Sequence, residues 1–418
     1  MTVPRSQREQ PQPLGWQHQP LGWHWEWVRP EPLQFHRLQL SLPNYRWWRP
    51  LLTVLLAVVY YLVLSVLLFV VYGIAMFANS RSGLAGLEQL DTSRVTDPMT
   101  LSLLLVSVIL MAPAVLLACL STGLRPWRHM LSVTSRIRWR WMLWCVMPAV
   151  VTFVGTQVLV SVLTIIASLT TGGISDHEAS ALSSTHGWVG WPTYAVLLGM
   201  IIVLVPLQAA TEEIVFRGLI LQTVGGWVRR PWVAAIPSVL LFTAGHGYGF
   251  WGQLSIVVFA VTTVWLTIRT GGLEASIALH VVNNVLLFVV QATGITGDDT
   301  LEGSADTPIV LFQEVILCGS FLCWVLIAAR RRRIDNRFHP APHPVPVWHG
   351  AQPTFAAQPP FAAQPPFAAQ PPFAAQPPFA AQPPFAAQPT DDTVSIRTLQ
   401  PSTDGDDEQH PPMQRTQK

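Results

Sequence analysis

Long apolar runs separated by short polar connections extend from Leu51 to Ala329. A helix needs about 20 apolar residues to cross a hydrocarbon core about 30 Å thick, and several of these runs reach that length. Charged residues make up 11% of the chain, against roughly 25% in soluble domains, and most of them lie outside the runs. The chain is therefore predicted to be an all-α, polytopic transmembrane helical bundle.

Eight of the apolar runs are candidate spans. They are Leu51–Phe77, Met99–Ser121, Met142–Leu169, Thr193–Val224, Trp232–Gly247, Leu254–Ile268, Leu273–Gln291 and Pro308–Ala329. The fifth and sixth runs are the shortest. We therefore expect about eight spans within a transmembrane domain that covers residues 51–329.

Arginines fall in alternate connections between the runs. They precede the first run, fill the connection after the second, and follow the fourth, sixth and eighth runs. These arginines are Arg37, Arg46, Arg49, Arg125, Arg128, Arg136, Arg138, Arg140, Arg229, Arg230, Arg269, Arg330, Arg331, Arg332 and Arg333. Because positive residues collect on the cytoplasmic side, we predict a multi-pass protein of the cell membrane with both termini in the cytoplasm.

The two ends of the chain differ from its apolar middle. Residues 1–50 are rich in Trp and Pro, and we interpret them as a cytoplasmic segment whose tryptophans lie at the membrane surface. Residues 330–418 are Pro-rich and repeat the sequence FAAQPP. Such a segment lacks the apolar content to fold, so it is predicted to be a disordered, extended tail. The net charge of +2 is too small to indicate a nucleic-acid partner.

Two adjacent carboxylates and an arginine interrupt the fourth run. Ionisable groups inside a membrane are costly to bury, so Glu212, Glu213 and Arg217 are functional candidates. Glu213 and Arg217 are four residues apart and can form an ion pair on one helix face. Glu212 points about 100° away from Glu213. We therefore expect the arginine to neutralise one carboxylate and leave the other free to act.

The fifth and seventh runs carry the other candidate groups. Phe242 and His246 lie four residues apart in the fifth run, and His280 and Asn284 do so in the seventh. Counted from the inner ends of their helices at 1.5 Å per residue, Glu212 and His246 lie about 18 and 21 Å deep. On the same scale His280 and Asn284 lie about 10 and 16 Å deep. We expect these groups to meet in one cavity in the inner half of the membrane.

A glutamate, two histidines and an asparagine around a water molecule suit peptide hydrolysis. Glu212 can act as the general base, and His246 can hold and orient the water. His280 and Asn284 can donate hydrogen bonds to the developing oxyanion, each worth about 3–4 kcal/mol. A zinc ion held by Glu212, His246 and His280 is the alternative. We favour a metal-free mechanism without a cofactor, because the sequence has no HExxH motif and His280 pairs naturally with Asn284 as a donor.

Three motifs follow one another along the chain: Glu212-Glu213-xxx-Arg217, Phe242-xxx-His246 and His280-xxx-Asn284. They resemble the ordered motifs of the CPBP family (CAAX prenyl protease and bacteriocin-processing), which is often labelled as a metalloprotease family. The resemblance covers roughly residues 193–291. It implies an intramembrane endopeptidase in which Glu212 is the base and His280 and Asn284 are oxyanion donors. The other motif residues would support the site.

The expected partners are the lipid bilayer and a membrane protein or peptide substrate, which could itself carry a lipid. Two other functions remain open. A non-catalytic immunity or scaffolding protein of the same fold is the first, although a scaffold has no use for a general base. A transporter that relays protons is the second, although the sequence shows no inverted repeats with paired broken helices. We therefore favour the endopeptidase.

Overall fold

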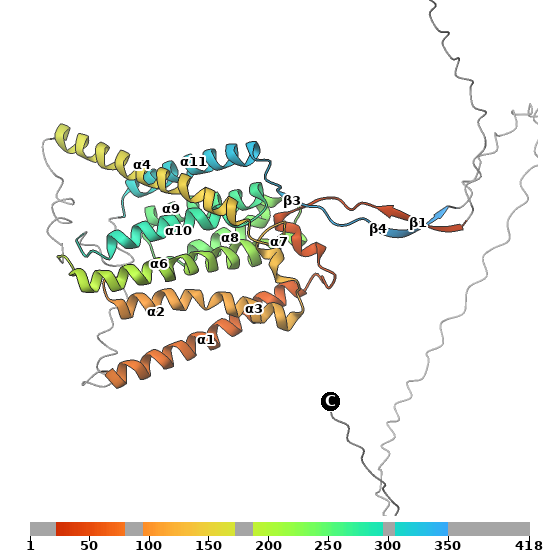
Figure 1. Cartoon of the computed structure of the whole chain (residues 1–418), viewed down its shortest axis with the longest axis horizontal. Coiled ribbons are helices and arrows are strands. Elements are labelled where there is room, and N and C mark those ends of the chain that lie inside the picture. The colour runs from red at the N-terminus through yellow and green to blue at the C-terminus, as the bar shows by residue number, and fades with distance from the viewer. Residues whose placement is uncertain (1–21, 80–94, 172–186, 296–305, 350–418) are drawn as a thin grey trace, which may run out of the picture. The chain divides into compact units, whose positions relative to one another are not determined.

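A computed structural model describes residues 22–79, 95–171, 187–295 and 306–349. Within these ranges the chain forms a bundle of helices that run roughly side by side, with short strands at one end (Figure 1). In this described part, seven helical stretches are long and apolar enough to cross a membrane. The prediction of a polytopic helical bundle is therefore confirmed.

The spans follow one another from α1 to α11. They are α1 (Arg49–Asn79), α2 (Pro98–Ile109) with α3 (Met111–Thr122), α4 (Trp139–Thr171), α6 (Trp191–Glu213) with η4 (Ile214–Ile220) and α7 (Leu221–Trp227), α9 (Phe250–Thr270), α10 (Glu274–Gln291) and α11 (Pro308–Arg331). A shorter apolar helix, α8 (Pro231–Ala244), lies between α7 and α9. Proline stands in the first turn of α2, α6, α8 and α11. Its missing N–H costs no hydrogen bond there, because N–H groups in the first turn have no acceptor within the helix.

Helix α8 is where the structure differs from the expected eight spans. Its 14 residues rise about 21 Å, less than the roughly 30 Å of a hydrocarbon core. The expected helix Trp232–Gly247 ends early because glycine alternates with other residues from Gly245 to Gly249, and glycine disfavours helix by about 1 kcal/mol per residue. Among the described residues, seven helical stretches rather than eight are therefore long enough to span.

The non-helical stretch after α8 leads to the end of the bundle at which α9 begins. Helix α9 begins at Phe250, and the amides of Trp251 and Gly252 donate to Asp306 Oδ1 at 2.7 and 3.0 Å. Asp306 lies two residues before the first residue of α11. Helices α9 and α11 therefore begin at the same end of the bundle, and α8 together with residues 245–249 connects the two ends.

The arginine-rich connections lie together at the other end of the bundle. His36 Nε2 is 3.1 Å from the carbonyl oxygen of Arg229. Arg138 forms an ion pair with Glu274 at 2.7 Å and donates to the carbonyl of Asp335 at 3.0 Å. These contacts join the segment before α1, the connections before α4, α8 and α10, and the segment after α11. The predicted alternation of arginine-rich connections is therefore present, and we call this the Arg-rich end.

Both flanks of the helical domain form short paired strands near the Arg-rich end. Strand β1 (Gly22–Val28) pairs antiparallel with β4 (His343–His349), and β2 (Leu33–Gln34) pairs with β3 (Arg337–Phe338). Between β2 and α1, the 3-10 helix η1 (Phe35–Ser41) packs against α7. The prediction of a disordered tail from residue 330 is therefore wrong for residues 330–349. Their partners lie about 300 residues away in sequence, so local composition did not reveal the pairing. The FAAQPP repeats lie outside the described residues.

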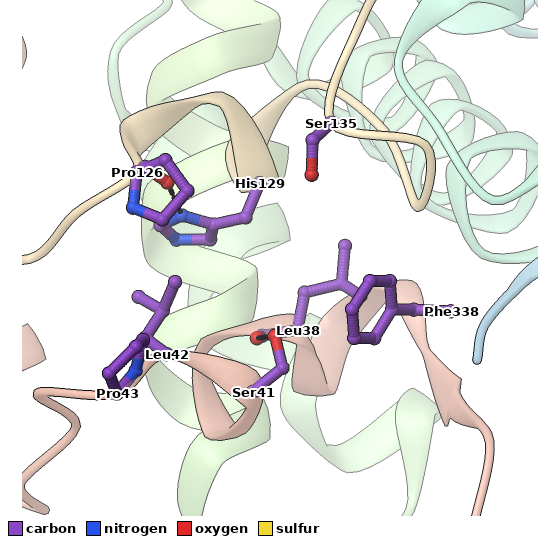
Figure 2. Close-up of a pocket in the computed structure, with 8 residues that line it drawn as sticks. All are labelled: Leu38, Ser41, Leu42, Pro43, Pro126, His129, Ser135 and Phe338. Atoms are coloured by element: carbon purple, nitrogen blue, oxygen red, sulfur yellow. Dashed lines mark hydrogen bonds between the residues drawn. The ribbon is translucent and has the colours of Figure 1, made fainter. Parts of the chain in front are cut away.

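A cavity of about 160 Å³ lies at the Arg-rich end (Figure 2). Its walls come from the segment before α1, the α3–α4 connection and β3. They are Leu38, Ser41, Leu42, Pro43, Pro126, His129, Ser135 and Phe338. In Figure 2, His129 lies beside Pro126, whose carbonyl is hydrogen-bonded to His129 Nδ1. None of the predicted site residues lines this cavity.

Candidate active site

Helix α10 is packed among α4, α6 and α9. Its first residues, Glu274 to His280, are all buried, and His280 is 2% exposed. A polar side chain at such a position must find hydrogen-bond partners within the bundle, because an unsatisfied buried group is costly. The partners of His280 come from α6.

Glu213 and Arg217 form a fully buried ion pair between α6 and η4. Arg217 Nη1 lies 3.3 Å from Glu213 Oε1, and neither side chain has exposed surface. Arg217 Nη2 also donates to Thr263 Oγ1 of α9 at 2.5 Å. The guanidinium carbon lies 4.2 Å from the centre of the Phe242 ring of α8. The predicted ion pair is confirmed, and its arginine also joins α6 and η4 to α8 and α9.

His280 lies between the two carboxylates of α6. Its Nδ1 is 2.9 Å from Glu213 Oε1, and its Nε2 is 3.3 Å from Glu212 Oε2. Because Glu213 is paired with Arg217, its carboxylate accepts the hydrogen bond and Nδ1 carries a proton. Both ring nitrogens therefore face carboxylates, whereas the sequence suggested an N–H that points at a substrate.

His280 Nε2 and Glu212 Oε2 lie within ion-pair distance, but Glu212 Oε2 has no hydrogen-bond partner among the described residues. With a proton on Nδ1, a neutral imidazole would present the lone pair of Nε2 to a carboxylate lone pair. One further proton, on the Glu212 carboxyl or on His280, would turn this contact into a hydrogen bond. In both cases the charges of Glu212, Glu213, Arg217 and His280 sum to zero, which lowers the cost of burying them. The proton can therefore move between Glu212 and His280 without changing the net charge of the cluster.

A second polar contact joins α6 and α10, one helical turn from the contact between His280 and Glu212. Asn284 Nδ2 lies 3.3 Å from Gln208 Oε1, and Asn283 Nδ2 lies 3.3 Å from Asn284 Oδ1. Gln208 precedes Glu212 by four residues, and Asn284 follows His280 by four. Since residues four apart lie on one helix face, the two contacts are adjacent rungs between helices that run in opposite directions.

Phe242 links the two histidines of the motifs. Its ring centre lies 4.8 Å from that of His246 and 5.9 Å from that of His280. His246 Nδ1 donates to the carbonyl of Phe242 at 2.8 Å, so Nε2 of the neutral ring is a hydrogen-bond acceptor. His246 follows the C-terminal end of α8, in the non-helical stretch. Its equal depth with Glu212 stays a prediction.

The helix changes its winding directly after the two glutamates. Segment η4 is π-helical over seven residues and contains Arg217. A π turn bonds residue i to i+5, is rare, and often occurs at functional sites. The carbonyl of Phe216, within this segment, accepts a hydrogen bond from Ser238 Oγ at 2.8 Å. The apolar pattern of the fourth run did not predict this local change.

The proposed zinc ligands do not form a metal-binding group in the structure. Glu212 and His280 are in contact, but His246 is joined to them through the Phe242 ring. Across the described ranges, no three His, Cys, Asp or Glu side chains are arranged to hold a metal ion. The set Glu212, His246 and His280 therefore does not fit zinc as it stands, and the metal-free mechanism stays a prediction.

Several residues that contact the motif residues were missed in the sequence, and Gln208 and Thr263 are two of them. Gln208 contacts Asn284, and Thr263 accepts a hydrogen bond from Arg217. Gln208 could have been found because it lies one turn before Glu212 on the same face of the fourth run. Thr263 carries no such signal, because threonine is common in apolar helices and its contact depends on how α9 packs.

Comparisons with known proteins agree with the motif pattern. Residues 193–286 match the model of the family described as "Type II CAAX prenyl endopeptidase Rce1-like". The uncharacterized protein YyaK of Bacillus subtilis (strain 168) is 26% identical over 218 residues, which are 50% of this chain and 68% of that protein. No solved structure matches this chain. The stretch from α6 to α10 that holds the three motifs is therefore Rce1-like, and at the level of the family it supports a CAAX-protease-like hydrolase in the membrane.

Proposed function

We propose that this chain is an intramembrane endopeptidase that hydrolyses peptide bonds of membrane-associated proteins or peptides. The observation that carries the proposal is the contact between Glu212 and His280, 3.3 Å apart and buried in the Rce1-like stretch. A carboxylate and an imidazole that share a proton inside an apolar bundle form an acid–base pair. A purely structural role for Arg217 would not require a second carboxylate and an imidazole beside the Glu213–Arg217 ion pair.

In the proposed reaction, Glu212 acts as a carboxylate while the shared proton is on His280. Glu212 takes a proton from a water molecule, and the water oxygen bonds to the peptide carbonyl carbon. The carbonyl oxygen becomes an oxyanion that accepts hydrogen bonds from His280 and Asn284. When the C–N bond breaks, the leaving nitrogen takes the proton from Glu212. All steps then use groups of this chain and one water.

His246 would orient the attacking water. Its Nδ1 is committed to the Phe242 carbonyl at 2.8 Å, so Nε2 can accept the second hydrogen of that water. The Phe242 ring, which contacts both histidines, would hold the imidazoles in place. Glu213 and Arg217 would act on the reaction through His280, whose Nδ1 they fix.

The substrate would reach the site from the bilayer, and the family description points to lipidated CAAX-type tails as one class of substrate.

We propose that the Arg-rich end faces the cytoplasm, because positive residues collect on the cytoplasmic side. A single cysteine placed at Arg136, in a variant without the native cysteines, should react with a membrane-impermeant maleimide only after cells are opened. Labelling of intact cells would reverse the orientation.

The test of the function is cleavage by the purified full chain in liposomes. The first substrate is a quenched fluorescent peptide that ends in a farnesylated CaaX sequence. The second is a set of membrane vesicles in which new peptide termini are counted by mass spectrometry. Glu212→Gln, which keeps the size of the side chain, should abolish cleavage of any substrate that the wild-type protein cuts. Removing metal with a chelator should leave cleavage unchanged.

A matched control distinguishes loss of chemistry from loss of fold. Glu274 is a buried glutamate of α10 that pairs with Arg138 at the Arg-rich end. Glu274→Gln should keep cleavage when rates are divided by the folded fraction. If Glu212→Gln cleaves at the wild-type rate, or if the wild-type protein makes no new termini in either assay, a non-catalytic immunity or scaffolding role becomes the better description.

A further inference from the structure

Gln208 places a second carboxamide beside that of Asn284, one helical turn before Glu212. It is 7% exposed, and its Oε1 accepts a hydrogen bond from Asn284 Nδ2 at 3.3 Å. A carboxamide has two N–H donors, so the two side chains hold four between them. The contact uses one of these, and it leaves both N–H groups of Gln208 and one of Asn284. This count suits a site that binds negative charge.

The count does not depend on which amide atom is oxygen. If both amides are turned over, Gln208 donates to Asn284, and each side chain still has at least one N–H beyond the contact. The helix also fixes where Gln208 lies relative to Glu212. The two residues are neighbours on one helix face, with Cβ atoms about 5–6 Å apart.

That spacing matches the geometry of water attack on a carbonyl. The attacking oxygen and the oxyanion are bonded to the same carbon, and each is held by its own partner at hydrogen-bond distance. Oxyanion donors act from about 2.7–3.1 Å. A donor one helical turn from the base can therefore reach the oxyanion while the base holds the water.

Both ring nitrogens of His280 lie close to carboxylates in this structure. Its Nδ1 is bonded to Glu213, and its Nε2 faces Glu212. His280 can donate to the oxyanion only through Nε2, which lies 3.3 Å from Glu212 Oε2. Gln208 can donate without disturbing either contact of His280.

We propose that Gln208 is a catalytic residue whose side-chain NH₂, together with that of Asn284, donates hydrogen bonds to the oxyanion. The inference rests on the proposed function, since it needs the hydrolysis at Glu212. In it, the carboxamide of Gln208 adds a donor to those of His280 and Asn284, from the contact one helical turn before Glu212.

The test is a double-mutant cycle on rates of cleavage by the full chain in liposomes. The substrate is the farnesylated CaaX peptide, or the most abundant Glu212-dependent product in the vesicle assay. Gln208→Leu removes the amide at similar length, and it should lower the rate about 100-fold, as expected for one lost oxyanion donor. Asn284→Ala should do the same. Two independent donors predict that the double variant loses the product of the two factors.

A positioning role for Gln208 gives a different result. If Gln208 only holds Asn284, then Gln208→Leu should have no effect once Asn284 is alanine. Such a result, or a Gln208→Leu rate within threefold of wild type, would overturn the proposal. Gln222 is the matched control, since it is a buried glutamine of the same span whose Nε2 donates to the His129 carbonyl at 3.1 Å. Gln222→Leu should keep the rate per folded molecule.

Glu212→Gln, measured in parallel, distinguishes a failure of the proposed hydrolysis from a failure of the proposed role of Gln208. If Glu212→Gln is inactive and Gln208→Leu is fully active, only the role of Gln208 fails. If Glu212→Gln is as active as wild type, the proposed hydrolysis fails, and the role of Gln208 fails with it.

Discussion

Arg217 and Glu213 are paired at 3.3 Å in a position where neither side chain reaches the surface. The arginine is also hydrogen-bonded to Thr263 and stacked over Phe242. One ion pair therefore joins four elements of the Rce1-like stretch, which are α6, η4, α8 and α9. It also holds the carboxylate that fixes Nδ1 of His280.

The first prediction concerns this pair. Arg217→Met leaves Glu213 as a buried charge with one partner fewer, so the protein should lose about 3–5 kcal/mol of stability. The double variant Arg217→Met with Glu213→Gln should recover much of that loss, because no unpaired charge remains. Unfolding in detergent with increasing denaturant measures both.

Arg269→Met is the control for this experiment. Arg269 is exposed at the end of α9, where its guanidinium carbon lies 4.7 Å from the centre of the Trp265 ring. Its removal should cost less than about 1 kcal/mol. If Arg217→Met costs no more than Arg269→Met, the buried pair does not stabilise the fold.

The second prediction concerns the docking of the segment before α1. Gly225 of α7 lies so close to the His36 carbonyl that an added Cβ would overlap it. Gly225→Ala should therefore push η1 away from α7, at a cost of about 1–3 kcal/mol. Limited proteolysis should then cut between residues 22 and 48 faster than in the wild type. On α6, nothing lies within 4 Å of a Cβ added at Gly199. Gly199→Ala should therefore cause no steric overlap, and the rate of proteolysis between residues 22 and 48 should stay as in the wild type.

The third prediction concerns pH. His129 lies outside the spans, in the 3-10 helix η3 (Trp127–Met130), and burial lowers its pKa from 6.5 to about 4. The unfolded chain takes up this proton below about pH 6.5, whereas the folded protein does so only near pH 4. The neutral ring therefore contributes its full stability above pH 6.5, and this is lost as the pH falls to about 4. The loss amounts to about 3 kcal/mol.

Unfolding midpoints between pH 7 and pH 4 measure this effect. His129→Gln cannot take up the proton, so its stability should fall less steeply across the same interval. His339, which is exposed beyond α11, provides the control, and His339→Gln should keep the wild-type slope. Equal slopes for His129→Gln and the wild type would show that another group is responsible.

Features that depend on local sequence were predictable. The length of each apolar run predicts a helix that can cross a bilayer, because backbone groups in lipid must bond within their own segment. The Glu213–Arg217 pair was predictable for the same reason, since both residues lie on one helix four positions apart. The motif residues Glu212, His246, His280 and Asn284 could be selected because polar groups are rare in such runs.

Other features depended on how separate helices pack. The π-helical segment and the pairing of β1 with β4 depend on contacts that sequence spacing does not reveal. The same holds for His280, whose spacing in α10 pairs it with Asn284, but whose ring nitrogens face Glu213 and Glu212. Spacing along one helix sets which residues share a face, whereas the register between α6 and α10 sets which faces meet. That register brings His280 to the glutamates and Asn284 to Gln208.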